Sequence, residues 1–446
     1  MTGAAQIAEF ALRTLRDGVP DDVLAAAHLH FLDGIGVGIA SATVAGNARW
    51  AAAAADGCAS LLTGGTAEPG AAAMINGALI HALEYDDTHF GSVVHGSAVA
   101  APLALAATQL ARGSGGDLIL AYIVAWEVAI RIGLAAPGGF QARGFQATSV
   151  GGAIGAAAAA SPVLGLDHGQ TVSAIGIAGG QASGTLAFLA DGAGSKALNP
   201  GWAARTGIDA ARLARAGMTG PASILESTFG VMNAFADGHG SLIQQLDTLG
   251  EDWLLPQAAF KLYPCCHYIH PYLEAIDQVM AEGLLPQDVL SLMAFVPPPQ
   301  APLICEPWSR RQAPLSGYDG KWGLAYCMAL MLIDGRVDVA SFESAPRDEV
   351  IRFARRMKWE PMQGHAFPAR FEARINIETG QGEVVAKIAQ VHGAPGRPIA
   401  DADIHTKFLM NAGRMKDKTE AKALQTYILR LNTAPDLEEI AALLRV

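Results

Sequence analysis

The sequence predicts a mainly α-helical protein in which a large all-helical domain, formed by both chain ends, carries an inserted smaller α+β lid domain. Three observations predict this class. Helical patterns run from the N-terminus to about residue 260, a stretch of alternating apolar and polar residues follows, and helical spacing returns from Ile404. We therefore place the helical domain at 1–263 and 398–446, and the lid domain at 264–397.

Helix starts in the first half are marked by proline and acidic residues. Pro20-Asp21-Asp22 and Pro69-Gly70 are typical of a first helical turn, and long Ala-rich runs separate the Gly-containing breaks. The 50 glycines of the chain favour close helix contacts, because small side chains let two backbones approach. Gly34, Gly36 and Gly38 lie in an apolar helical run with no strand before it, so we interpret them as packing residues rather than a dinucleotide-binding loop.

The segment 264–397 has a different pattern. Residues 297–299 are three prolines that break the chain, and residues 371–379 alternate as in a strand. The Gly-containing turn 380–382 and the following segment 383–390 predict the returning strand of an antiparallel hairpin. Two further segments have helical spacing: 323–334 and 346–357. We expect this α+β unit to face the helical body across a cleft.

Composition and charge narrow the classes of function. Of the 446 residues, 51% are hydrophobic and 16% are charged, which indicates a globular chain with extensive burial. The net charge of −11 argues against nucleic acid or an anionic membrane as a partner, because both require a cationic face. An anionic substrate therefore needs a local basic pocket.

Cysteine usage and the N-terminal sequence predict a cytoplasmic protein. The five cysteines form an odd set without a CxxC pair, which fits a reducing compartment. Arg13 and Arg16 interrupt the apolar pattern where a signal peptide would lie. The most apolar stretch, 118–134, contains Glu127 and Arg131, so we interpret it as a buried helix rather than a membrane span.

The densest polar cluster is HALEYDDTH, residues 81–89, followed by GSVVHGS, residues 91–97. One alternative is helix capping and turn formation by its acidic residues and threonine. A second alternative is a metal site, because His81 and Glu84 are three apart and His89 and His95 lie nearby. We predict no metal, since no second matching pair and no HExxH sequence accompany them.

A second cluster, KLYPCCHYIHP at 261–271, lies where the helical half passes into the α+β segment. Junctions between domains are common places for pockets, and a Lys, two His, two Tyr and two Cys within eleven positions favour function over packing. The adjacent Cys265 and Cys266 are more typical of buried packing thiols than of nucleophiles.

Two cations stand beside flexible glycines. Arg143 lies in ARGFQATSVGG (142–152), and Lys196 lies in DGAGSKALNPGWAAR (191–205). Lys196 precedes Pro200, a possible helix start, so backbone N–H groups and an ammonium could converge on one carboxylate. The alternative interpretation of Lys196 is an exposed loop lysine.

These segments, together with GKWGLAYCMALMLIDGRV at 320–337, resemble the MmgE/PrpD family in their order along the chain. That family includes 2-methylcitrate dehydratases, cis-aconitate decarboxylases and iminodisuccinate epimerase. The resemblance implies a helical domain made of both chain ends, an inserted α+β lid, a homodimer and an active site without a cofactor.

The resemblance also implies functional positions. They are Glu84, Thr88, His95, Gln146, Lys196, Lys261, Cys266 and Tyr326, with His270 close by and the neighbouring Asp87 and His267 among the expected substrate-binding residues. Three positions depart from the family pattern. Glu84 stands where many members have Asp, Gln146 where catalytic members commonly have His, and Cys266 where the animal decarboxylases have His. Glutamine can hydrogen-bond a carboxylate but cannot exchange a proton near neutral pH.

Our hypothesis is a lyase that removes the proton next to a carboxylate of a small di- or tricarboxylate, with dehydration as the reaction. His95 is the expected base, with Tyr326 or His270 as the acid for the leaving hydroxyl. The substrate carboxylates are expected to bind three cations: Lys196, Lys261 and Arg143. Epimerisation, with Lys196 opposed by another base, decarboxylation of a cis-aconitate-like acid and a binding protein without activity remain the alternatives.

Overall fold

The computed structural model describes residues 1–190, 193–238 and 240–445. The chain forms two compact units. Unit 1 consists of Met1–Ala82, Asp86–Ala259 and Ala400–Val446, and unit 2 consists of Leu83–Tyr85 and Phe260–Ile399. The chain therefore leaves unit 1 for three residues after Ala82 and returns to it at Asp86. The predicted domain boundaries and the cleft stay predictions.

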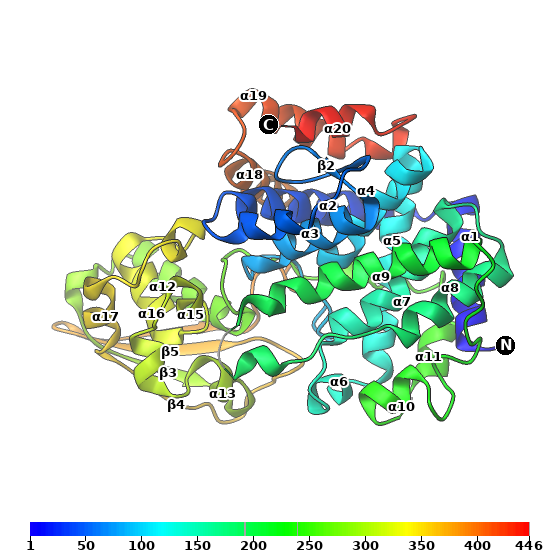
Figure 1. Ribbon diagram of the computed structural model, residues 1–446. Helices are drawn as coiled ribbons and strands as arrows, with labels where there is room; N and C mark the ends of the chain where they lie inside the picture. Colours follow the sequence, from blue (N-terminus) through cyan, green and yellow to red (C-terminus); the bar gives the residue numbers. More distant parts are fainter. Residues whose placement is uncertain (191–192, 239, 446) are drawn as a thin grey trace. The chain divides into compact units, whose positions relative to one another are not determined.

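Helices make up most of unit 1, which agrees with the mainly α class predicted from the sequence (Figure 1). The N-terminal and central helices are α1 (Gly3–Asp17), α2 (Asp21–Ala42), α3 (Pro69–Ala82), α4 (Ser97–Ala111), α5 (Gly115–Ala135), α6 (Gly139–Ala142), α7 (Ala147–Val163), α8 (His168–Gly180), α9 (Leu198–Arg215), α10 (Val231–Ala236) and α11 (Leu242–Asp247). The C-terminal helices are α18 (Asp401–Ala412), α19 (Lys418–Ile428) and α20 (Glu438–Leu444). The predicted helix starts at Asp21 and Pro69 are confirmed.

Small residues let the central helices of unit 1 pack closely. Helix α7 contacts α5, α8 and α9, and α3 contacts α4 and α9. A Cβ on Gly77 would lie 2.5 Å from the Cα of Gly201, so α3 and α9 touch backbone to backbone at this point. Gly36 faces Phe408 of α18 and Gly38 faces Ile80 of α3, which confirms that the predicted glycine run packs helices.

Two helices of unit 1, α2 and α5, are long and apolar enough to cross a membrane. In their most apolar windows, 78% of the α2 residues and 89% of the α5 residues are buried inside the molecule. Such burial is typical of core helices, whose apolar faces are covered by protein on all sides.

A buried ion pair ties the C-terminal helices to α2, on which α18 packs. Lys407 Nζ lies 2.7 Å from Asp33 Oδ1, and both side chains are almost fully buried. Burial raises the pKa of the Asp33 carboxyl to about 6, although Lys407 acts in the opposite direction. The contact joins the two ends of the chain within one unit.

Unit 2 contains a four-stranded sheet in the order β4-β3-β5-β6. Its strands are β3 (Val289–Val296), β4 (Met357–Pro361), β5 (Ala373–Thr379) and β6 (Gly382–Ile388), and its helices are α12 (His270–Ala281), α13 (Ala301–Ile304), α14 (Trp308–Gln312), α15 (Gly317–Gly320), α16 (Leu324–Asp334) and α17 (Asp348–Ala354). Strands β5 and β6 form the predicted antiparallel hairpin, whereas β3 and β4 pair in parallel. Helix α12 covers β5 and β6 and contacts α16.

Four strands were not predicted. Strand β3 is apolar except for Ser291 and does not alternate in sequence, and β4 begins at Met357, the residue at which the predicted helix was expected to end. A two-stranded sheet of β1 (Ala59–Ser60) and β2 (Thr66–Ala67) interrupts the helical half. Its two strands are too short to give a periodic signal.

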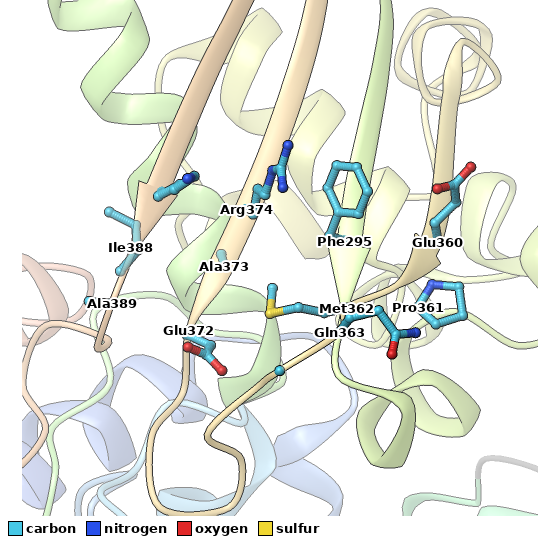
Figure 2. Close-up of a pocket in the computed structure, with 12 residues that line it drawn as sticks. Phe295, Glu360, Pro361, Met362, Gln363, Glu372, Ala373, Arg374, Ile388 and Ala389 are labelled. Atoms are coloured by element: carbon cyan, nitrogen blue, oxygen red, sulfur yellow. The ribbon is translucent and has the colours of Figure 1, made fainter.

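The sheet face opposite its buried side chains is polar and hollowed. Ala373, Ile375 and Ile377 of β5 are buried, while the alternate residues Arg374 and Glu378 are exposed, as expected when side chains alternate along a strand. A hollow of about 730 Å³ lies over this face, and its lining includes Phe295, Arg374, Glu360 and Lys387. Figure 2 shows most of the lining side chains, among them Phe295, Arg374 and Glu360. None of its lining residues belongs to the predicted functional positions.

Candidate functional site

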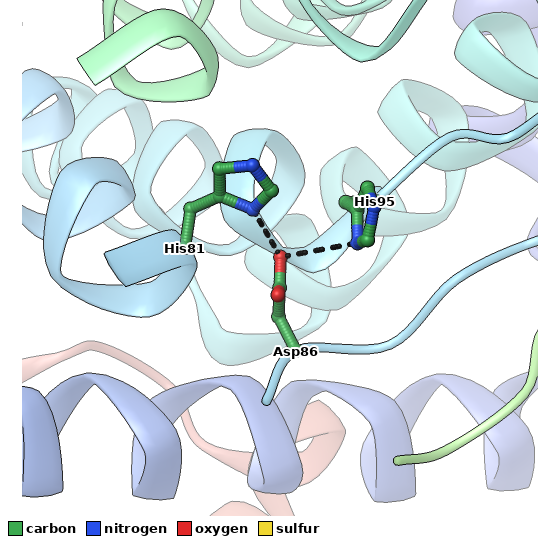
Figure 3. A group of neighbouring side chains, drawn as sticks. All are labelled: His81, Asp86 and His95. Atoms are coloured by element: carbon green, nitrogen blue, oxygen red, sulfur yellow. Dashed lines mark hydrogen bonds and ion pairs between the residues drawn. The ribbon is translucent and has the colours of Figure 1, made fainter. Parts of the chain in front are cut away.

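The first group of polar side chains lies in unit 1 between the end of α3 and the start of α4. His81 is in the last turn of α3, Asp86 follows where the chain re-enters the unit, and His95 lies two residues before α4 (Figure 3). His81 Nδ1 lies 2.7 Å and His95 Nδ1 lies 3.5 Å from the same oxygen, Asp86 Oδ2. His81 and Asp86 are fully buried, whereas the His95 side chain is 14% exposed. His95 is therefore the member of this group that reaches the surface.

Oxygen atoms surround the Nδ1 atom of His95. Besides Asp86 Oδ2, Thr88 Oγ1 and the carbonyl oxygen of Asp87 each lie 3.1 Å from it. The backbone N–H of His95 donates to Thr148 Oγ1 at the start of α7, which fixes the main chain here. Thr88 and His95, two predicted site residues, are thus brought into contact.

Gln146 lies at the N-terminal end of α7 and is 7% exposed. Its Nε2 lies 3.1 Å from His81 Nε2, and its Oε1 accepts a hydrogen bond of 3.0 Å from Asn199 Nδ2. Both ends of the amide are therefore used within the protein. Gln146 therefore contacts His81 at Nε2, the ring nitrogen that does not face Asp86, rather than lying beside His95.

Asp87, predicted to bind substrate, is fully buried and accepts hydrogen bonds from other parts of unit 1. His30 Nδ1 donates to Asp87 Oδ2 over 2.7 Å, and Ser97 Oγ donates to the same oxygen over 2.6 Å. Ser97 Oγ also contacts Tyr122 Oη at 2.7 Å. These bonds join α2, α4 and α5, so the carboxylate of Asp87 serves packing between helices.

The two glycine-flanked cations have different surroundings. Lys196 lies in a short 3₁₀ turn, Gly194–Ala197, just before α9, and is 7% exposed, so the interpretation as an exposed loop lysine is wrong. Arg143 is 44% exposed, and its Nη1 lies 3.5 Å from Asp237. Asp191 and Gly192, which begin the predicted Lys196 motif, lie outside the described residues.

The structure changes which residues could bind a metal ion at the first polar group. Glu84 belongs to unit 2 and not to the group around His81. Among the described residues, the His, Cys, Asp and Glu side chains close enough to share a cation are His81, Asp86 and His95, whose ligand atoms lie within 4.8 Å of one another. His89 contacts Ser92 instead, and burial lowers its pKa to about 4.

The second polar group lies in unit 2 around Leu83–Tyr85. Glu84 has a φ of 55°, a left-handed conformation that costs a non-glycine residue free energy. Lys261 Nζ donates to the carbonyl oxygen of Glu84 at 3.0 Å, and Lys321 Nζ donates to that of Leu83 at 2.6 Å. Tyr318 Oη donates to Glu84 Oε1 at 3.1 Å. Two lysines and a tyrosine thus hold this segment in its unusual conformation.

Lys321 was not among the predicted site residues, although it lies in the 320–337 motif. Its side chain is 4% exposed, and burial lowers the pKa of its ammonium to about 8, with Glu84 acting in the opposite direction. The sequence signal that could have found it is the lysine between two glycine-containing turns, Gly320 and Gly323, ahead of α16.

The other predicted residues of unit 2 lie near the start of α12 and in α16. The His267 and His270 rings are 4.6 Å apart, and His270 also contacts the Tyr263 ring. Burial raises the pKa of the Cys266 thiol to about 12, which disfavours the thiolate that a nucleophile needs. Tyr326 Oη accepts a hydrogen bond from the Arg347 N–H, and burial raises the pKa of its phenol.

Both halves of the chain match one family. The MmgE/PrpD N-terminal domain matches residues 5–243, and the MmgE/PrpD C-terminal domain matches residues 263–433. The chain therefore belongs to the MmgE/PrpD family.

Individual relatives extend over almost the whole chain. Cis-aconitate decarboxylase-like protein oryM of Aspergillus oryzae is 28% identical, over 99% of this chain and 96% of that protein. Cis-aconitate decarboxylase of Aspergillus terreus is 29% identical, over 99% of this chain and 95% of that enzyme. Human cis-aconitate decarboxylase is 28% identical, over 84% of this chain and 79% of that enzyme.

Proposed function

We propose that this protein is a cofactor-independent lyase that acts on a small di- or tricarboxylate. The observation that carries the proposal is the His95 ring, which is partly exposed while oxygens of Asp86, Asp87 and Thr88 surround its Nδ1. Family membership and the decarboxylase relatives support a carboxylate-directed lyase in general terms.

The first step is removal of the proton next to a substrate carboxylate. In the neutral ring, a proton on His95 Nδ1 leaves the lone pair of Nε2 to accept that proton. The resulting carbanion or enolate needs cations, for which we propose Lys196 and Lys261. Dehydration follows when the hydroxyl on the neighbouring carbon takes a proton from His270 or Tyr326 and leaves as water. A double bond then replaces the C–H and C–O bonds.

Decarboxylation is the second candidate, and the named relatives favour it. In that reaction the C–C bond to one carboxylate breaks, CO₂ leaves, and the electron pair stays on carbon until a proton is returned to it. The same cations would stabilise the charge on the substrate. His95 would then act as an acid and donate its proton, rather than accept one.

Substrate tests in D₂O distinguish these reactions. The protein is incubated with 2-methylcitrate, citrate and cis-aconitate while alkene absorbance, CO₂ release and deuterium incorporation are followed. Alkene formation from a hydroxy acid supports dehydration, and CO₂ release supports decarboxylation. Deuterium exchange without either product would identify an epimerase. No change in any of these compounds or in a wider panel of dicarboxylates would contradict the enzyme proposal and favour a binding protein.

Substitution of Lys196 tests the proposed binding of carboxylate. Lys196→Ala should lower kcat/KM by about 100-fold or more, because a charged hydrogen bond to substrate in a buried place contributes several kcal/mol. Lys418→Ala removes an exposed lysine at the start of α19 and serves as the matched control. Equal activity of the two variants would exclude Lys196 from the reaction.

We further propose a cytoplasmic homodimer. The five cysteines, Cys58, Cys265, Cys266, Cys305 and Cys327, are free thiols, which supports a reducing compartment. Light scattering should give about twice the chain mass of 46.3 kDa. Fractionation of cells that express the protein tests the compartment.

A further inference from the structure

A series of hydrogen-bonded side chains in unit 1 leads from α9 to Asp86, whose carboxylate lies beside His95. Asn199 Nδ2 lies 3.0 Å from Gln146 Oε1, Gln146 Nε2 lies 3.1 Å from His81 Nε2, and His81 Nδ1 lies 2.7 Å from Asp86 Oδ2. Asp86 Oδ2 then lies 3.5 Å from His95 Nδ1. Three of these residues, Asn199, His81 and Asp86, were not among the predicted site residues.

The donors and acceptors at the two ends fix the direction of every bond in this series. Asn199 Nδ2 also faces the carbonyl oxygen of Thr185 at 3.5 Å, which can only accept, so the NH₂ group of Asn199 is on this side. Gln146 must then accept with Oε1 and donate with Nε2. His81 consequently accepts at Nε2 and carries its proton on Nδ1, where it donates to the Asp86 carboxylate.

The His95 ring is oriented by the same logic. Its Nδ1 faces a carbonyl oxygen and a carboxylate oxygen, which both accept, so the neutral ring carries its proton on Nδ1. The titratable groups that face it include Asp86 and His81, whose ring centroid is 4.9 Å away. When His95 gains a second proton, the Asp86 carboxylate beside it stabilises the positive charge.

We propose that Gln146, His81 and Asp86 are positioning residues that hold His95 as a base with its lone pair on Nε2. This inference rests on the proposed function. Gln146 acts through His81 and not on the substrate: its amide donates to His81 Nε2 and so keeps the His81 proton on the side of Asp86. Proton transfer in the site therefore does not need a histidine at position 146, because His95 is the residue that exchanges the proton.

His81, Asp86 and His95 also have the spacing of a cation site. The hydrogen bonds decide whether these side chains position a proton or bind a metal ion. A cation between His81, Asp86 and His95 would need the lone pairs of both Nδ1 atoms. The assigned directions place protons on both. A cation-binding site is therefore the competing outcome of the experiment.

Nitrogen NMR of the histidine rings tests the assignment without any substrate. In protein labelled with ¹⁵N-histidine and dialysed against chelator, the His81→Gln variant identifies the His81 signals. We expect a protonated Nδ1 and an unprotonated Nε2 at His81, unchanged by Zn²⁺. The Gln146→Glu variant replaces the amide donor by an accepting carboxylate, so both His81 nitrogens should become protonated. A proton on Nε2 in the natural protein, or a shift of the Nδ1 signals on Zn²⁺ addition, would overturn the proposal.

The pH profile of kcat/KM tests the effect on His95. Asp86→Asn keeps the shape of the side chain but removes its charge, so the acid limb should move to lower pH by about one unit. Asp209→Asn, on the surface of α9, is the control and should leave the limb in place. An unmoved limb in a folded Asp86→Asn protein would refute the role of Asp86. If no carboxylate is turned over, the proposed function fails, while the NMR result still decides the hydrogen-bond series.

Discussion

The segment 81–95 supplies a polar group to each of the two units, and the two groups are built differently. In unit 1, His81, Asp86 and His95 contact one another through their side chains. In unit 2, the backbone carbonyls of Leu83 and Glu84 accept hydrogen bonds from the ammonium groups of Lys321 and Lys261. Contacts between side chains join His81, Asp86 and His95, whereas both lysines of the unit 2 group bind the main chain.

The two groups therefore contribute to different properties of the protein: the unit 1 group to the position of protons, and the unit 2 group to the conformation of the main chain. A change in the unit 1 group alters which atom carries a proton, with little change in the course of the chain. A change in the unit 2 group releases a backbone segment in which Glu84 has a φ of 55°. Substitutions in the first group should therefore affect activity and its pH profile. In the second group, substitutions of Lys321 and Tyr318 should affect stability, whereas substitution of Lys261, a proposed substrate cation, should affect stability and activity together.

The largest expected effect is the loss of activity in His95→Asn. Asparagine keeps a donor near the Nδ1 position but offers no base, so kcat/KM should fall by about 10²- to 10⁴-fold. The free energy of unfolding should change by less than about 1 kcal/mol, because the ring is partly exposed. Steady-state kinetics and urea unfolding measure the two quantities. His168→Asn, at the exposed start of α8, is the control, and activity within threefold of it would contradict the assignment of the base.

Lys321→Met tests the unit 2 group through the pH dependence of stability. The pKa of Lys321 is about 8 in the folded protein because of burial, below its ordinary 10.5, so the unfolded chain binds more protons between these pH values. The free energy of unfolding therefore rises with pH across that window. The full destabilising cost of burying the Lys321 charge is present below pH 8. The Met variant should lack this rise, which amounts to a difference on the order of 3 kcal/mol by pH 10.5.

Denaturant unfolding of both proteins at several pH values measures that difference. Lys418→Met replaces an exposed lysine and should parallel the natural protein throughout. A constant gap between the Lys321→Met and natural proteins from pH 7.5 to 10.5 would show that Lys321 is charged over the whole range.

A smaller effect is expected for the thiols. Cys266 is buried and its pKa is raised to about 12, whereas Cys58 is exposed. Iodoacetamide at pH 8 should therefore alkylate Cys58 well before Cys266, because the thiolate is the reactive form. Peptide mass spectrometry at increasing times measures both rates. Faster labelling of Cys266 would reverse our interpretation of it as a packing thiol.

Much of the fold was predictable because it depends on local patterns. Asp21 and Pro69 begin helices where the sequence indicates them, and the β5–β6 hairpin follows from alternation around a glycine turn. Strand β3 could not be predicted in the same way. It pairs with β4 on one side and β5 on the other. Its residues are apolar except for Ser291, and such a run looks the same in a buried helix.

The polar groups were predictable as motifs but not as contacts. The sequence places His81 and Asp86 five residues apart, yet their hydrogen bond depends on the three-residue excursion of the chain between them. Gln146 reaches His81 from 65 residues away, and Lys321 reaches Leu83 from 238 residues away. Such partners depend on tertiary packing, which no local pattern records.

The smallest expected effect is that of Tyr318→Phe, which removes the hydroxyl that donates to Glu84 Oε1. The loss of this hydrogen bond should lower the free energy of unfolding by about 1 kcal/mol. A double-mutant cycle with Glu84→Gln isolates the contact: if the pair interacts as the structure has it, the double variant is less destabilised than the sum of the single variants by about 1 kcal/mol. Additivity within about 0.3 kcal/mol would mean that the two lysines alone hold this segment, because the carbonyl contacts of Lys261 and Lys321 are unchanged in all three variants.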